Sequence, residues 1–136
     1  MSLRWRADRI SGRRAYGGVL VVPCLVHDEY RYWFLVDTGT VLTTINRYVA
    51  EELGLDLNRP SRQQRIASVH RTDLAPVVCL TSLKVGPYRL VGVEALVLAL
   101  PPLLRVDGLL GVNFLEHFRP TFEFEQAVLV LRQRAV

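Results

Sequence analysis

An apolar run ends on a carboxylate in the segment WFLVDTGT, residues 33–40. A buried, unpaired carboxylate is costly, and such a group normally shifts its pKa or finds hydrogen-bond partners. Two interpretations are therefore open for Asp37. It is a surface turn residue, because Asp and Gly are favoured in turns, or it is held in a partly dry site where a carboxylate acts as a general acid or base.

A second segment, DGLLGVNFL at residues 107–115, follows about seventy residues later. Two apolar residues and a glycine precede a stretch that has the pattern of a short amphipathic helix. Asp107 and Gly108 are interpreted as a turn and not as a second catalytic acid. An Asp-Thr-Gly triplet arises by chance in roughly one chain in a few tens of this length, so Asp37 becomes a strong catalytic candidate only because both segments occur together.

Short β-type runs separated by turn residues position these two segments. Residues 17–26 and 30–36 are rich in aliphatic and aromatic side chains, and residues 27–29 join them as a hairpin. Trp33 and Phe34, in the second of these runs, are expected in the core. Further strands are predicted at residues 42–45, 65–69, 74–85, 88–98, 121–124 and 128–131.

Two helices are predicted between the strands. The first begins after a cap at Asn46 and stops at Gly54. The second covers one or two turns within residues 113–118 and ends before Pro120. The chain is therefore expected to form one mostly β domain with one or two short helices.

The composition excludes several other classes of protein. A chain of 136 residues is long enough for one core and one domain. The net charge of +4 comes from basic residues spread along the chain, with small concentrations near both ends, which argues against a nucleic-acid or membrane surface. No run of 18 apolar residues is present, so no membrane span is expected.

Cysteine and histidine usage gives no sign of a metal or a disulfide framework. Cys24 and Cys79 lie far apart in apolar runs and are predicted to be reduced, buried thiols. His27, His70 and His117 are scattered, which argues against a metal site. With no credible secretory signal and no disulfide pattern, a cytoplasmic location is favoured.

The two segments together resemble those of the retropepsin-like aspartic proteases, the single-lobe, homodimeric branch of the pepsin clan. The resemblance extends from about residue 17 to residue 131 and includes the opening hairpin, the Asp-Thr-Gly loop, a flap-like hairpin and the Leu-Leu-Gly segment with its helix. It implies a closed or partly open β-barrel of the acid protease type over residues 17–136. Residues 1–16 are interpreted as a basic N-terminal extension, either disordered or arranged at the dimer surface.

The resemblance implies an aspartic endopeptidase that needs no cofactor or metal. The chain has one Asp-Thr-Gly, so the second carboxylate would be Asp37 of another copy across a two-fold axis. A homodimer would then hydrolyse a peptide or protein substrate with water. The resemblance also implies a set of residues that support the active-site loop: Thr38, Gly39, Thr40, Leu110, Gly111 and Asn113.

The flap-like hairpin departs from the pattern of the family. Relatives often have glycines at its tip, whereas this chain has Ser68, Val69, His70 and Arg71 there, so the tip is expected to be stiffer or differently shaped. The four side chains are candidates for facing substrate. Solvated loop residues are the alternative interpretation for His70 and Arg71.

Two further functions compete with the protease. One is a non-catalytic module of the same fold that dimerises or captures peptides, which the glycine-free flap favours. The other is a small basic β-barrel that binds nucleic acid. Such barrels interleave aromatic and basic side chains on one sheet face, and Arg31-Tyr32-Trp33 is a thin match, so no nucleic-acid partner is expected.

Overall fold

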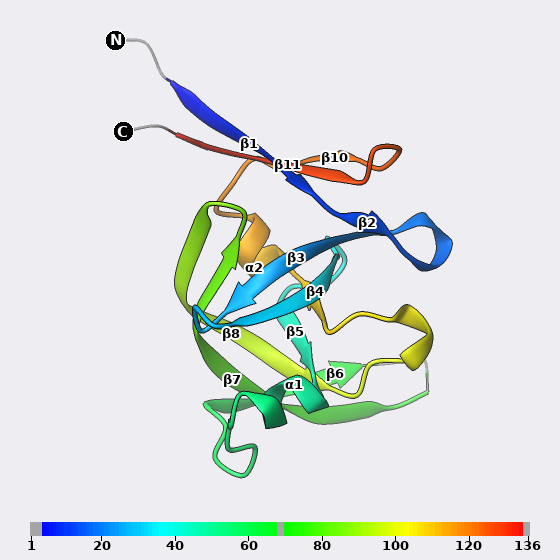
Figure 1. The fold of residues 1–136 in the computed structure, drawn as a ribbon. Coiled ribbons are helices and arrows are strands. Elements are labelled where there is room, and N and C mark those ends of the chain that lie inside the picture. Colours follow the sequence, from blue (N-terminus) through cyan, green and yellow to red (C-terminus); the bar gives the residue numbers. More distant parts are fainter. Residues whose placement is uncertain (1–3, 68–69, 135–136) are drawn as a thin grey trace.

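The computed structural model describes residues 4–67 and 70–134 and shows a mostly β fold (Figure 1). The predicted strand at residues 30–36 is present with those bounds as β4, and the one at 88–98 as β8. In chain order the elements are β1 Trp5–Ser11, β2 Arg13–Arg14, η1 Tyr16–Gly18, β3 Leu20–Val26, β4 Tyr30–Val36, β5 Thr43–Asn46, α1 Arg47–Glu52, β6 Arg62–Ala67, β7 Thr72–Val85, β8 Tyr88–Leu98, η2 Pro102–Leu104, β9 Gly108–Leu110, α2 Val112–Leu115, β10 Thr121–Glu123 and β11 Val128–Arg134.

The larger sheet has the strand order β2-β3-β4-β9-β5-β8-β7-β6. Strand β3 also pairs with β7. This pairing closes a ring that contains, in order, β3, β4, β9, β5, β8 and β7. Within the ring, β4 and β9 run parallel, with Val36 opposite Leu110. The expectation of a mostly β fold with one or two short helices is confirmed.

The core fills the interior of this ring. Strand alternation along β4 directs Tyr32 and Phe34 inward, where they pack with Phe114 of α2. Trp33 lies on the opposite face and is 37% exposed, with the Arg13 guanidinium 5.0 Å from the centre of its ring. The prediction that Trp33 belongs to the core is therefore wrong, because a period of two allows only one of two neighbouring aromatics to face inward.

The same alternation corrects the prediction for Cys79. Val78 and Leu80 on either side of it point into the protein, so Cys79 is exposed on β7 opposite Glu94. Cys24 is a buried free thiol, as predicted. Burial raises the pKa of the Cys24 thiol, because an apolar interior disfavours the thiolate.

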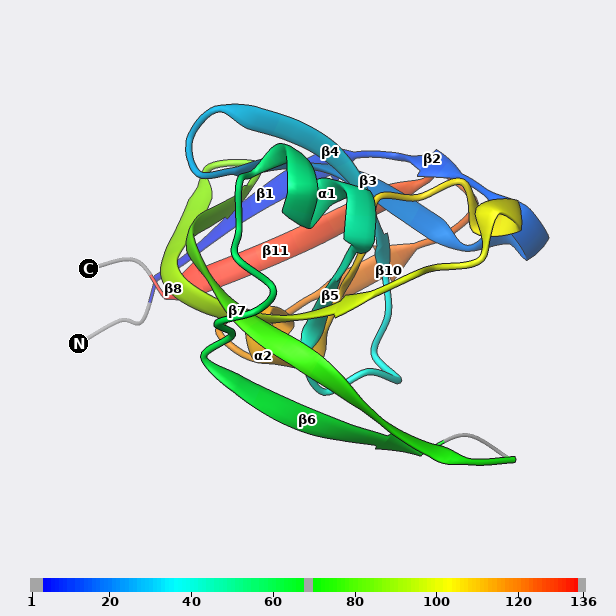
Figure 2. The same cartoon turned by 90° about the horizontal axis from the view of Figure 1, so that it is seen from below.

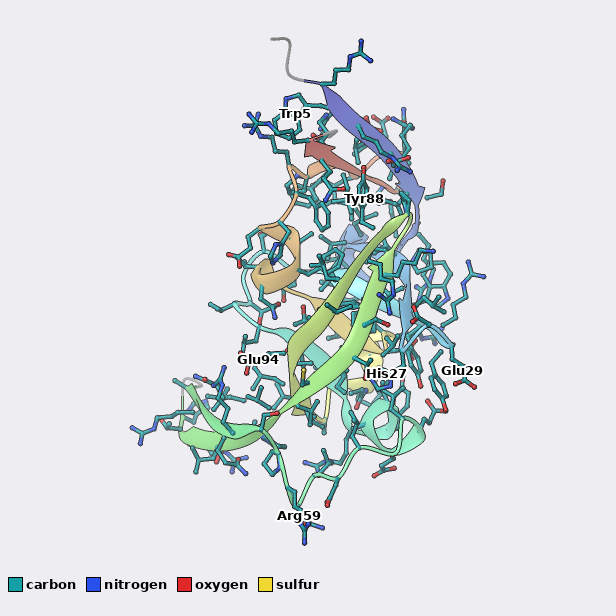
Figure 3. All side chains as sticks on the ribbon, turned by 90° about the vertical axis from the view of Figure 1, so that its left-hand side faces the viewer. Trp5, His27, Glu29, Arg59, Tyr88 and Glu94 are labelled. Carbon is teal, nitrogen blue, oxygen red and sulfur yellow. The ribbon has the colours of Figure 1, made fainter. Side chains whose placement is uncertain are left out.

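A second, smaller sheet contains both ends of the described chain, with the strand order β1-β11-β10 (Figure 1). Residues 5–11 are therefore an ordered strand that pairs with β11 along its whole length, and not a disordered extension. Tyr88 begins β8, directly after the β7–β8 turn (Figure 3). It links the smaller sheet to the ring, since its hydroxyl donates to Asp8 Oδ2 at 2.6 Å. Burial and this hydrogen bond raise the pKa of Tyr88 to about 12.

The helices are short and lie beside the strands that carry the two segments. Asn46 caps α1, because its Oδ1 accepts a hydrogen bond from the backbone N–H of Arg47. Helix α2 is a single turn over residues 112–115, and turns continue to residue 118, so the prediction of a helix within residues 113–118 holds only at its start. Among the described residues, no helix is both long and apolar enough to cross a membrane.

Candidate active site

Asp37 begins the loop that follows β4, where the buried strand reaches solvent. Its backbone N–H donates to the Leu110 carbonyl at 3.0 Å, which continues the β4–β9 pairing by one residue. Its Oδ1 accepts a hydrogen bond from the Gly39 N–H at 2.9 Å. Asp37 is thus partly exposed, and a backbone donor orients its carboxylate.

Gly39 leaves space directly beside this carboxylate. A Cβ atom on Gly39 would lie 3.1 Å from Asp37 Oδ1, closer than ordinary van der Waals contact. Thr38 and Gly39 are both exposed, whereas the hydroxyl of Thr40 turns back and donates to the Leu42 carbonyl at 3.1 Å. The loop therefore exposes Thr38 to solvent, and a hydrogen bond between Thr40 and Leu42 lies at its other end.

The Leu-Leu-Gly segment lies directly against this loop. Leu110 is fully buried and pairs with Val36. A Cβ atom on Gly111 would lie 2.8 Å from the backbone atoms of Leu42 and Thr43, so only glycine fits between the two segments without a backbone shift. The two segments named from the sequence are thus brought into contact.

Asn113 connects three elements through one side chain. Its Oδ1 accepts hydrogen bonds from the Thr43 backbone N–H and hydroxyl, both at 2.8 Å. Its Nδ2 donates to the Glu94 carbonyl on β8 at 2.9 Å. The Thr43 hydroxyl in turn accepts from the Gly111 N–H at 3.1 Å. The strand after the Asp37 loop is therefore fixed to α2 and to β8 by a closed set of hydrogen bonds.

Thr43 has a part in this network that the sequence analysis missed. It is a fully buried polar residue at the start of β5, whose sequence is TTIN. Its hydroxyl donates to Asn113 and accepts from Gly111, so burial leaves neither its proton nor its oxygen without a hydrogen-bond partner. Two adjacent threonines within the strand predicted at residues 42–45 were the available signal, since a hydroxyl that becomes buried needs a partner.

Asp107 has a structural role at the other end of the parallel pair. Its Oδ2 accepts from the Trp33 N–H at 2.7 Å, and its Oδ1 accepts from the Tyr48 hydroxyl. Burial and this bond raise the pKa of Tyr48. Because Asp107 lies beside Trp33, four residues before Asp37, the two carboxylates are separated by about 13 Å of strand.

The flap-like hairpin consists of β6 and residues 72–77 of β7, and it projects from the body of the molecule (Figure 2). Ile66 is partly buried and packs against the cluster formed by Ala75, Val77 and Leu96. His70 and Arg71 at the tip are exposed, and Arg71 forms an ion pair with Asp73 at 2.8 Å. The other two tip candidates, Ser68 and Val69, lie outside the described residues.

Within residues 4–67 and 70–134, no three His, Cys, Asp or Glu side chains gather in a way that could hold a metal ion.

A ring of strands with an Asp-Thr-Gly loop lying on a Leu-Leu-Gly segment defines a retropepsin-like aspartic protease fold. The family model described as aspartyl protease matches residues 22–114, which include the first segment and all but the last residue of the second. The chain belongs to the aspartyl protease family. A solved structure of a retropepsin-like aspartic protease from Rickettsia conorii is similar over 99% of this chain and 98% of that one, with a TM-score of 0.73 and 22% identity. No match was found among proteins with curated descriptions.

Proposed function

We propose that this chain is an endopeptidase that works as a symmetric homodimer, in which Asp37 of each copy forms half of a catalytic pair. The observation that carries the proposal is the Asp37 carboxylate, which is partly exposed and oriented by the Gly39 N–H at 2.9 Å. One carboxylate acting as base and one carboxylic acid acting as proton donor are sufficient for a protein to catalyse the attack of water on a peptide bond. Asp107 is unsuited to the second role, because Trp33 and Tyr48 occupy its oxygens.

Two aspartates about 3 Å apart share one proton, because like charges at that distance cannot both ionise. The ionised carboxylate takes a proton from water, the hydroxide attacks the carbonyl carbon, and the protonated carboxyl gives its proton to the carbonyl oxygen. When the tetrahedral intermediate collapses, the C–N bond breaks as one carboxyl gives its proton to nitrogen and the other takes a hydroxyl proton. The pair is left with one proton, as it began.

The residues around the loop have positioning roles in this proposal. The Asn113–Thr43–Gly111 hydrogen bonds fix the backbone that follows Asp37. Thr38 is exposed beside the carboxylate and is available to meet the loop of a second copy. An extended substrate would lie between the carboxylates and the β6–β7 hairpin, where backbone hydrogen bonds can add it as a strand.

The decisive test replaces Asp37 by Asn, which keeps the size of the side chain and removes the base. We expect the Asp37→Asn dimer to keep its fold and mass while cleavage of a peptide library falls by roughly a hundred- to ten-thousand-fold. Asp56→Asn is the matched control, since Asp56 is exposed in the loop after α1. Full peptidase activity in Asp37→Asn, or activity in a species shown to be monomeric, would refute the mechanism.

A non-catalytic module of the same fold is the second candidate, and the glycine-free tip of the flap favours it. Such a module would dimerise and hold an extended peptide without cleaving it. A purified dimer that binds peptides but leaves a diverse library intact between about pH 3 and 8, a range that brackets a shared-proton pair, would establish this candidate over the protease.

A further inference from the structure

Two cations flank a leucine on the outer face of the ring, far from Asp37. In the strand register Leu25 of β3 lies opposite Arg31 of β4 on one side and opposite Lys84 of β7 on the other. Directly paired residues point to the same face of a sheet. Arg31, Leu25 and Lys84 therefore form a row across three strands, with both charges on the same side.

Strand β1 turns this row into a cavity. Arg9 and Ile10 line it from one side, and Pro23, which shares the face of Leu25, extends its apolar floor. Gly86 allows the close approach of β1, since a Cβ there would lie 2.7 Å from the Ile10 side chain. The resulting hollow has a volume of about 450 Å³, which is in the range of small-molecule sites.

The charge of this cavity is one-sided. Its lining contains Arg9, Arg31 and Lys84 and no carboxylate. Arg9 is paired with Glu123 at 2.9 Å, whereas neither Arg31 nor Lys84 has an ion pair or a side-chain hydrogen bond within the described part of the chain. Lys84 interacts electrostatically with the carboxylate of Asp28. Both oxygens of that carboxylate already accept hydrogen bonds from the Arg89 guanidinium, each at 2.8 Å.

We propose that this cavity binds a small organic anion, with a carboxylate or phosphate group between Arg31 and Lys84 and an apolar part on Ile10, Pro23 and Leu25. An anion would pair two cations that the protein leaves to solvent, and charge-assisted hydrogen bonds are the strong class. The apolar floor adds burial that inorganic phosphate cannot use. Arg31 lies six residues before Asp37 on β4, about 20 Å away along the strand, so this site is separate from the active-site loop.

Titration of the full chain with phenyl phosphate and with benzoate, followed by backbone amide chemical shifts, tests the proposal. We expect saturable binding with the largest shifts at residues of β3, β4 and the β7–β8 turn, and at least tenfold weaker binding of inorganic phosphate and of benzyl alcohol. Arg31→Gln and Lys84→Gln should each weaken binding about tenfold or more, as the loss of a charge-assisted hydrogen bond predicts. Lys84→Arg should retain it.

Arg59→Gln is the matched control, because Arg59 carries the same charge at the end of the molecule opposite to Trp5 (Figure 3). It should leave the affinity unchanged. Tighter binding of phenyl phosphate would assign a phosphate group, and tighter binding of benzoate a carboxylate. The absence of saturable binding of either anion up to about 10 mM, or an equal loss of affinity in Arg59→Gln and Lys84→Gln, would overturn the proposal.

Discussion

Asn113 offers the most quantitative test of how the Asp37 loop is held. The change Asn113→Ala removes three hydrogen bonds, two from Thr43 and one to the Glu94 carbonyl. At about 0.5–1.5 kcal/mol for each bond, the free energy of unfolding should fall by roughly 1.5–4.5 kcal/mol. Thr43 is fully buried, so its N–H cannot turn to water, and we expect about 3 kcal/mol.

A double-mutant cycle in urea separates this network from a simple loss of packing. Thr43→Val keeps the shape of the side chain but removes the hydroxyl that joins Asn113 to Gly111. We expect a coupling energy between Thr43→Val and Asn113→Ala of about 1 kcal/mol or more. Asn58→Ala, at an exposed position, should change the stability by no more than about 0.5 kcal/mol. A loss below about 1 kcal/mol for Asn113→Ala, or full additivity with Thr43→Val, would refute the reasoning.

Three further predictions concern other parts of the fold. Gly111→Ala should cost about 2 kcal/mol of stability in urea, because its Cβ would meet backbone 2.8 Å away, whereas Gly39→Ala should cost less stability and chiefly lower kcat, since its Cβ would meet only Asp37 Oδ1. Tyr88→Phe should lose about 1 kcal/mol near neutral pH with the bond to Asp8. The pKa of Tyr88 in the folded protein is raised to about 12, so the stabilisation by its neutral hydroxyl is complete below the ordinary tyrosine value near 10 and is lost as the pH rises toward 12. Over that window the stability of the wild-type protein should therefore fall more steeply than the stability of Tyr88→Phe. Cys79 should react with a thiol reagent in the native protein and Cys24 only after unfolding, as a Cys79→Ser variant would establish by losing all native labelling.

Local chemistry explains which elements could be predicted from the sequence. Strands β4 and β8 were predicted with their observed bounds because each is an apolar run between turn residues. The start of α1 was predicted from Asn46, whose side chain caps it. Trp33 and Cys79 were misassigned because a run of apolar letters does not say which residue faces inward.

Long-range pairing explains what the sequence analysis missed. Residues 5–11 read as a basic tail, and they are a strand only because β11 pairs with them. Likewise, Thr43 and Tyr48 were not singled out, because their partners Asn113 and Asp107 lie 70 and 59 residues further along the chain. The segments at Asp37 and Gly111 were found because their residue types are distinctive. Thr43 and Tyr48 belong to common residue types, and only the folded structure shows that they lie beside their distant partners.

The parallel pairing of β4 and β9 decides how many chains the proposed chemistry needs. Asp37 follows the end of β4, whereas Asp107 precedes the start of β9, so parallel strands place these acids at opposite ends of the pair. Both oxygens of Asp107 also accept hydrogen bonds, one from the Trp33 N–H and one from the Tyr48 hydroxyl. These two bonds join the residue before β9 to β4 and α1. Moving this carboxylate toward Asp37 would break both of these hydrogen bonds. Under the proposed mechanism the second acid must therefore come from outside this pair of strands, and a two-fold axis beside the exposed Asp37–Gly39 loop supplies it with no further residue.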